Sequence, residues 1–211
     1  MVLSKWCTED NCCDSIYGEY PPGTKCVKIE ETNIIPSSAF VNSTELIYVY
    51  GVNSKIEILG VRSFVNLGKL INIHLPFNMI REIHGEVFVN VSATLLDLSW
   101  NKIYCLNQHA FDGLYNLKYL NLSRNVITTF QLLPNNPFLE ELILSYNMLT
   151  TVALSSYRYP NLTNIDLSFN KLTGIALSFV EPIRKLDLTY NSLNSFSVSD
   201  FAVEELKNSF K

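Results

Sequence analysis

The octapeptide IDLSFNKL at positions 165–172 occurs twice more in altered form, as LDLSWNKI at 96–103 and LDLTYNSL at 186–193. All three fit one wider template, L-x-x-L-x-L-x-x-N-x-L-x-x-L. Six clear copies carry the template's asparagine, at Asn78, Asn101, Asn125, Asn147, Asn170 and Asn191. A weaker copy has Ser54 in that slot, so successive slots lie 21 to 24 residues apart, and a weaker one still covers 27–34. Self-similarity at such a period is typical of a stacked repeat protein.

The L-x-L core of each copy predicts one short strand, because apolar and other residues alternate with a period of two. Its leucines point inward and its intervening residues outward. A single copy cannot bury that apolar face alone, whereas stacked copies bury it against their neighbours. The repeat therefore predicts a parallel sheet with a spacing of about 4.8 Å per coil.

The recurring asparagine follows from the turn that each coil must make after its strand. A sharp turn inside the coil leaves backbone N–H and C=O groups in the interior, where they need partners. Asparagine offers both donors and an acceptor on a short side chain. We therefore expect a structural ladder, and not a binding site, at Asn78, Asn101, Asn125, Asn147, Asn170 and Asn191.

A second column of aromatic residues follows the asparagine slots by about half a coil. It predicts an aromatic spine on the far side of the solenoid, formed by Phe40, Phe64, Phe88, Phe111, Tyr157, Phe179 and Phe201. Asn135 interrupts the column, with prolines on both sides. We expect an irregular loop at 131–138.

Four of the five cysteines crowd the N-terminus: Cys7, Cys12, Cys13 and Cys26. The spacing and the lack of partner histidines do not fit a metal site. Two disulfides are expected instead, with their connectivity open, and they imply an oxidising compartment. Cys105 stands apart and is expected to be a buried free thiol, with a bond to another chain as the alternative.

The template and its period resemble the extracellular, typical class of leucine-rich repeat proteins over residues 24–211. The cysteine cluster resembles their N-terminal cap, although that cap usually separates its middle cysteines and Cys12 and Cys13 are adjacent here. The degenerate copies and Val203-Glu-Glu-Leu-Lys207 resemble insect leucine-rich immune proteins. The resemblance implies an α/β-type solenoid, mostly β with an irregular back side: a right-handed horseshoe with a concave parallel sheet.

The expected organisation is a disulfide cap at 1–26 followed by about eight repeats at 27–211, with a degenerate or truncated final copy. The first residues show no apolar signal-peptide core. No run of 18 apolar residues occurs, so no membrane span is expected in this chain. The net charge of −4 argues against nucleic acid as a partner, because such a domain needs a basic face.

The outward positions show no catalytic or metal site. His74 would lie one coil from Asp97 and near Ser99, but a hydrolase also needs an aligned base and an oxyanion hole. Asp166 and Asp187 would stack, yet a calcium site needs several more oxygens. No enzyme, metal or cofactor is predicted.

The residue before each asparagine is often aromatic. The column reads Asn53, Phe77, Trp100, Arg124, Tyr146, Phe169 and Tyr190. These side chains either only stack on each other or also form a recognition ridge, since Trp, Tyr and Arg dominate interface hot spots. The predicted partner-binding patch on the concave face is Tyr48, Tyr50, Phe77, Trp100, Tyr119, Arg124 and Tyr146. An acidic stretch beside it, which should steer a basic partner, is Glu140, Glu141, Asp166 and Asp187.

Four N-x-S/T sequons mark candidate glycosylation sites: Asn42, Asn90, Asn121 and Asn161. Their use would imply secretion, and a glycan on Asn121 would block the concave face. The favoured function is a secreted or ectodomain recognition module that binds a protein partner, with innate immunity suggested by the resemblance. The alternatives are direct binding of a microbial glycan or lipid, and a fragment of an adhesion or Toll-like receptor ectodomain. The oligomeric state is left open.

Overall fold

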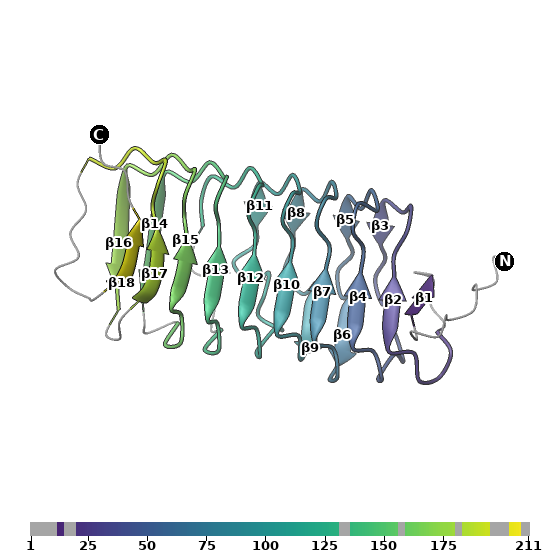
Figure 1. The fold of residues 1–211 in the computed structure, drawn as a ribbon. Coiled ribbons are helices and arrows are strands. Elements are labelled where there is room, and N and C mark those ends of the chain that lie inside the picture. The colour runs from purple at the N-terminus through teal and green to yellow at the C-terminus, as the bar shows by residue number, and fades with distance from the viewer. Residues whose placement is uncertain are drawn as a thin grey trace.

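The chain winds into a solenoid of parallel strands (Figure 1). The structure, a computed structural model, describes residues 12–14, 20–130, 136–155, 159–179, 183–194 and 203–207. Ten strands of this described part form one parallel sheet. In spatial order they are β1 (Cys12–Asp14), β2 (Cys26–Lys28), β4 (Tyr48–Tyr50), β7 (Asn72–His74), β10 (Leu95–Asp97), β12 (Tyr119–Asn121), β13 (Glu141–Ile143), β15 (Asn164–Asp166), β17 (Ile183–Asp187) and β18 (Val203–Lys207).

The sheet keeps one register from coil to coil, so equivalent residues of the template lie side by side. Val49 pairs with Ile73, and Leu96 pairs with both Ile73 and Leu120. Each of these central residues is fully buried, while its two neighbours in the strand are half-buried. The predicted parallel sheet with an inward L-x-L core is confirmed.

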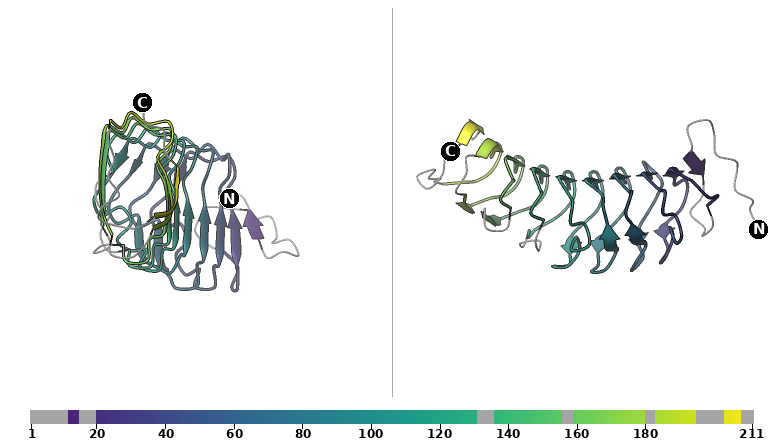
Figure 2. Two further views of the ribbon diagram at one scale, coloured as in Figure 1. Left: turned by 60° about the vertical axis from the view of Figure 1, so that its left-hand side comes forward. Right: turned by 90° about the horizontal axis from the view of Figure 1, so that it is seen from below.

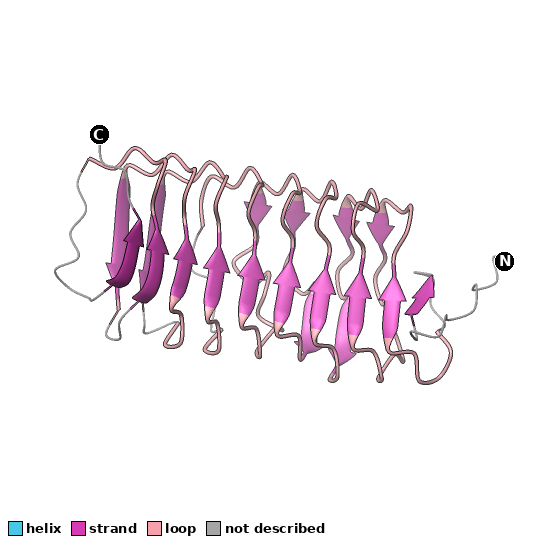
Figure 3. Cartoon of the chain, viewed as in Figure 1, coloured by secondary structure: helices cyan, strands magenta, loops and turns pink. Residues whose placement is uncertain are grey.

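Short strands also form on the other sides of the coil (Figure 3). Three parallel pairs follow the asparagine turns: β3 (Ile34–Ile35) with β5 (Ile58–Leu59), β8 (Glu82–Ile83) with β11 (Cys105–Leu106), and β14 (Thr151–Ser155) with β16 (Gly174–Ser178). A fourth pair, β6 (Phe64–Leu67) with β9 (Phe88–Val91), lies on the return side. The back of the solenoid is thus more regular than the sequence indicated.

The solenoid is curved, and the ten-stranded sheet lines the inner side of the arc (Figure 2, right). The apolar core fills the space between this concave sheet and the back strands. The described residues form strands, turns and loops without a helix. None of their elements could therefore serve as a membrane-spanning helix.

The aromatic spine is present in the N-terminal half. Successive ring centroids of Phe40, Phe64, Phe88 and Phe111 lie 4.9, 5.2 and 6.3 Å apart, and Tyr20 extends the stack beyond Phe40 at 6.0 Å. All four phenylalanines are buried. Offset rings at these separations stabilise each other beyond their area burial.

The second half of the predicted spine is only partly described. Phe179 is buried, whereas Tyr157, Phe201 and Asn135 lie outside the described residues, as does 131–135 of the expected loop. Asn136 is fully buried, and its Nδ2 donates to the carbonyl of Leu114 at 2.9 Å.

Each template asparagine hydrogen-bonds its own turn and the preceding coil. Asn101 Nδ2 lies 3.0 Å from the carbonyl oxygens of Leu75 and Leu98 and 3.2 Å from that of Ser99. Its Oδ1 accepts from the backbone N–H of Ile80 at 3.0 Å. The same pattern recurs at Asn78, Asn125, Asn147, Asn170 and Asn191. The side chains thereby satisfy buried backbone groups in each pair of coils.

The cysteines differ in environment. Cys26 is buried and disulfide-bonded, and β1 extends the sheet beyond it. Cys7 and the side chains of Cys12 and Cys13 lie outside the described part, so the two-disulfide cap stays a prediction. Cys105 is free but exposed, which corrects the expectation of a buried thiol. Its strand neighbour Leu106 turns toward the core, so Cys105 faces solvent.

Candidate recognition surface

The residue before each template asparagine adopts a left-handed backbone conformation. The φ angles are 54° at Asn53, 57° at Phe77, 54° at Trp100, 55° at Arg124, 55° at Tyr146, 53° at Phe169 and 56° at Tyr190. This region costs a residue with a Cβ about 1–2 kcal/mol. The turn holds it through bonds between coils; Trp100 N–H, for example, donates to the carbonyl of Ser123 at 3.0 Å. Because φ is nearly the same at all seven residues, their side chains point in the same direction from successive coils.

The last six of these side chains form a continuous stack, which we call the edge ladder: Phe77, Trp100, Arg124, Tyr146, Phe169 and Tyr190. The rings of Phe77 and Trp100 are 5.0 Å apart. The Arg124 guanidinium lies 4.2 Å from the Trp100 ring and 3.9 Å from the Tyr146 ring. Phe169 lies 4.1 Å from Tyr146 on one side and from Tyr190 on the other.

The edge ladder lies where the chain leaves the C-terminal ends of the concave strands, along the upper border of the sheet in Figure 1. Four of its members remain exposed, Phe77 by 49%, Trp100 by 45%, Tyr146 by 38% and Tyr190 by 66%, whereas Phe169 is half-buried. Each aromatic stack or cation–π contact contributes about 0.5–1.5 kcal/mol. The ladder is therefore a ridge of stacked, largely apolar side chains on the surface of the described residues.

Aspartates three residues before the ladder cap the same turns, a role that was not predicted from the sequence. Asp97 Oδ1 accepts from the N–H of Ser99 at 2.9 Å. Asp166 Oδ1 binds both the N–H and the hydroxyl of Ser168, at 3.0 and 2.7 Å. Asp187 repeats this with Thr189, and Asn121 with the N–H of Ser123. The recurring D/N-L-S/T tripeptide was the available indication of these Asx turns.

The N-terminal part of the concave sheet carries a second aromatic group. Tyr48 stacks on Tyr50 with ring centroids 6.0 Å apart, and Tyr50 stacks on His74 at 5.6 Å. His74 Nδ1 lies 3.6 Å from Asp97 Oδ2. The predicted patch is thus divided between two regions: the edge ladder at the border, and Tyr48, Tyr50 and Tyr119 on the strands.

Tyr119 occupies the middle of the sheet in β12. Burial, followed by the charges of Glu141 and Asp97, raises the pKa of its phenol. The hydroxyl therefore remains protonated at neutral pH and can donate a hydrogen bond to a partner.

The predicted acidic stretch is less acidic than the sequence indicated. Glu140 lies 2.8 Å from Lys118 in an ion pair. Further along, Arg184 pairs with Glu204 at 3.9 Å. Glu141, beside Tyr119 in β13, makes no ion pair among the described residues, and further negative charge lies beside the edge ladder, in the aspartates that cap its turns.

Three of the four sequon asparagines are exposed and lie outside the ten-stranded sheet: Asn42, Asn90 and Asn161. Asn121 is the exception, because it is half-buried within β12 and its Oδ1 accepts from Ser123. A glycan at Asn121 alone would project from the concave sheet.

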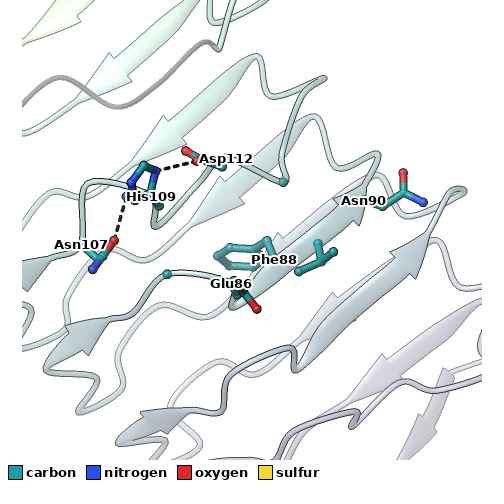
Figure 4. Close-up of a pocket in the computed structure, with 9 residues that line it drawn as sticks. Glu86, Phe88, Asn90, Asn107, His109 and Asp112 are labelled. Carbon is teal, nitrogen blue, oxygen red and sulfur yellow. Dashed lines mark hydrogen bonds and ion pairs between the residues drawn. The ribbon is translucent and has the colours of Figure 1, made fainter.

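A cavity of about 590 Å³ lies on the return side of the coils, away from the predicted patch (Figure 4). Its lining includes Glu86, Asn90 and Gly113, and an ion pair between His109 Nδ1 and Asp112 Oδ2 at 2.8 Å. Across the ranges that the structure describes, no group of three or more acidic, histidine or cysteine side chains is arranged to hold a metal ion.

The repeats match established families. Residues 92–149 and 161–181 match two models of the leucine-rich repeat. No curated protein is significantly similar to the chain in sequence.

Solved structures share the fold at low identity. The leucine-rich repeat domain of APL1B superposes with a TM-score of 0.63 at 20% identity, over 82% of this chain and 58% of that one. A chain of the Drosophila Toll–Spatzle complex superposes with a TM-score of 0.57 at 20% identity, over 81% of this chain and 29% of that one. The leucine-rich repeat domain of APL1 superposes with a TM-score of 0.51 at 20% identity, over 90% of this chain and 63% of that one. The chain thus spans less than two thirds of each of these proteins.

Stacked coils, a concave parallel sheet and a buried asparagine ladder define a leucine-rich repeat solenoid. The chain contains leucine-rich repeats in the matched ranges, and its fold resembles that of the APL1B leucine-rich repeat domain and of the chain from the Toll–Spatzle complex.

Proposed function

We propose that the chain is an extracellular recognition module that binds a protein partner through its concave sheet and the edge ladder. The observation that carries this proposal is the uncovered stack from Phe77 to Tyr190. Large exposed apolar side chains usually mark an interaction site. Trp, Tyr and Arg are the residues that dominate binding hot spots, and here their geometry is fixed before a partner arrives.

The geometry favours a protein over a glycan. Sugar recognition by aromatic residues uses the faces of the rings. In the ladder the faces of Phe169 are covered by its neighbours 4.1 Å away, with interplanar angles of 8° and 15°. Trp100 is covered by Phe77 on one side and Arg124 on the other. The ring edges that remain suit side-chain packing by a protein.

Three features support an extracellular location. Cys26 is disulfide-bonded, a bond that persists in oxidising compartments. Asn42, Asn90 and Asn161 offer exposed sequons. The neighbours in fold include the Drosophila receptor Toll, which was solved with Spatzle as a hub of development and innate immunity. We extend an immune role to this chain by that likeness, as a secreted factor or as part of an ectodomain.

The test is affinity capture from extracellular fluid of the source organism, followed by quantitative binding of the captured protein. The double variant Trp100→Ala/Arg124→Ala should weaken binding by about 2 kcal/mol or more, roughly 30-fold in Kd. Tyr104→Ala is the matched control, because Tyr104 is 51% exposed but lies beyond the asparagine turn, next to Glu82.

A glycan array run with the same material tests the main alternative. Glycan binding that the double variant abolishes, without a captured protein, would replace the proposal. Unchanged protein binding by a folded double variant would move the interface away from the ladder.

A further inference from the structure

Two rows of side chains run in parallel along the upper border of the concave sheet. One is the edge ladder, and the other consists of Asp97, Asp166 and Asp187. Each aspartate precedes a ladder member by three residues in its own coil: Trp100, Phe169 and Tyr190 respectively. An exposed apolar ridge and a line of negative charge are thus placed side by side.

The carboxylates are held in fixed orientations. In all three, Oδ1 accepts from a backbone N–H of the turn at 2.9 to 3.0 Å. Asp97 Oδ2 lies 3.6 Å from His74. The remaining oxygens of Asp166 and Asp187 are thereby left to accept from a partner. Neighbouring strands of a sheet are about 4.8 Å apart, so these two charges repel each other, and Lys207, opposite Asp187 on the next strand, offsets part of this repulsion.

Most of the other charges of this region are paired: Glu140 with Lys118, Glu204 with Arg184, and Glu205 with Lys207. Lys207 also lies opposite Asp187 and limits the aspartate row at that end. Apart from these pairs the region carries Glu141 and the three aspartates against Lys185 and the ladder's own Arg124, so the excess charge is negative and three of the four carboxylates lie next to the ladder.

From this juxtaposition we infer that the edge ladder is the docking line for an extended, basic segment of a protein partner. The inference rests on the proposed function and specifies its partner. Lysine and arginine combine an apolar stem, which packs on ring edges, with a cationic head that reaches a carboxylate. No neutral or acidic segment satisfies both rows.

The spacing of the carboxylates also predicts the spacing of the basic residues in the bound segment. Asp97 and Asp166 are separated by three strand steps, from β10 through β12 and β13 to β15, or about 14 Å. Four residues of an extended chain cover nearly the same distance, at about 3.4 Å per residue. The fitting segment therefore carries basic residues at positions i and i+4, with one apolar side chain at i+2 on the same side.

A second copy of this chain fits the ladder poorly. Two ladders facing each other in antiparallel fashion bring one aspartate row against the other, and like charges repel. Charge complementarity thus favours a basic partner over self-association.

The test is selection of displayed random peptides of about 12 residues on the purified protein, followed by fluorescence anisotropy of the enriched sequences. Enriched peptides should carry Lys or Arg at i and i+4. The triple variant Asp97→Asn/Asp166→Asn/Asp187→Asn should weaken them about ten-fold or more, and Tyr146→Ala should do the same. Asparagine is a safe replacement because Asn121 already makes the same turn bond to Ser123.

Glu140→Gln and Tyr104→Ala are the controls: Glu140 directly precedes β13 and is paired with Lys118, and Tyr104 lies beyond the asparagine turn, next to Glu82. Each should change the affinity less than about three-fold. The inference is overturned if the enriched peptides lack basic residues. It is also overturned if basic peptides bind the triple variant with unchanged affinity. An absence of enrichment, or a dimer of the chain that Trp100→Ala dissociates, overturns it as well. Peptides lost only on Tyr48→Ala or Tyr119→Ala overturn it while leaving the proposed function intact.

Discussion

At the scale of single residues, the template asparagine and the residue before it have different roles in the same turn. Asn147 points inward, where Nδ2 reaches Leu122 O at 2.9 Å and Leu144 O at 3.0 Å. Tyr146 points outward because its φ of 55° turns the side chain away from the coil. One turn thus supplies a buried hydrogen-bond centre and an exposed recognition group.

Replacing Asn147 by alanine should lower the free energy of unfolding by roughly 1–3 kcal/mol, because it leaves buried backbone groups of two coils unpaired. The orphaned groups include the N–H of Ile127, now 3.0 Å from Oδ1. Lys171→Ala is the control, since Lys171 lies next to a template asparagine but is exposed. Urea titrations of both variants measure the difference, and equal shifts would remove the structural role of the asparagine.

Cys105 should react with iodoacetamide in the native protein, because its thiol is free and exposed. Cys26 should not, since it is buried and disulfide-bonded. Mass spectrometry of the alkylated, undigested protein should show a single addition. A Cys105 peptide that is unlabelled in the native protein but labelled after reduction would place Cys105 in a disulfide with another molecule.

At the scale of elements, the sequence predicted the concave strands well because their pattern is set by burial alone. The leucine at the template position of Leu96 and Leu120 must face the core in every copy. The left-handed turn was not predicted, since Trp100 and Phe169 have no local preference for positive φ; the hydrogen bonds between coils impose it. Cys105 was misplaced for a similar reason, because the sequence did not reveal the pairing of β11 with β8.

The return segment of one coil approaches the strand of the preceding coil very closely at Gly113. A Cβ at this position would lie 2.1 Å from the carbonyl oxygen and 2.6 Å from the carbonyl carbon of Phe88. Gly113→Ala should therefore destabilise the protein by about 3 kcal/mol, because backbone and not a flexible side chain must move.

Gly68→Ala is the matched control for Gly113→Ala. A Cβ added at Gly68 would meet no other atom within 4 Å, and the φ of this residue is not left-handed. Alanine there should be neutral or stabilising by up to about 1 kcal/mol, because it reduces the conformational entropy of the unfolded chain. Thermal melts separate the two variants, and similar midpoints would contradict the close approach.

At the scale of the whole molecule, each coil contacts chiefly its neighbours, so stability is distributed along one dimension. An open solenoid end exposes its core and an unpaired strand, so it needs a cap. We predict that Cys7, Cys12, Cys13 and Cys26 form two disulfides, as a cap requires. Peptide mapping without reduction should recover both bonds, and four free thiols would reject the cap.

Reduction should loosen the solenoid from one end. Amide exchange should accelerate first in β2, β4 and β7 and least in β13 and β15, because coupling between coils decays along the array. A uniform acceleration over all strands would instead indicate one cooperative unit.

The distribution of sequons over the curved molecule leads to the last prediction. Asn42, Asn90 and Asn161 are exposed outside the concave sheet, whereas Asn121 is half-buried in its centre and bound to Ser123. In material secreted from eukaryotic cells we expect glycans at the first three positions and an unmodified Asn121. Enzymatic deglycosylation in heavy-oxygen water, followed by mass spectrometry, marks each used asparagine. A glycan at Asn121 would exclude the strands around Tyr119 from any interface. Because Asn121 lies in the row between Asp97 and Asp166 and precedes Arg124 by three residues, the glycan would also obstruct the middle of the edge ladder.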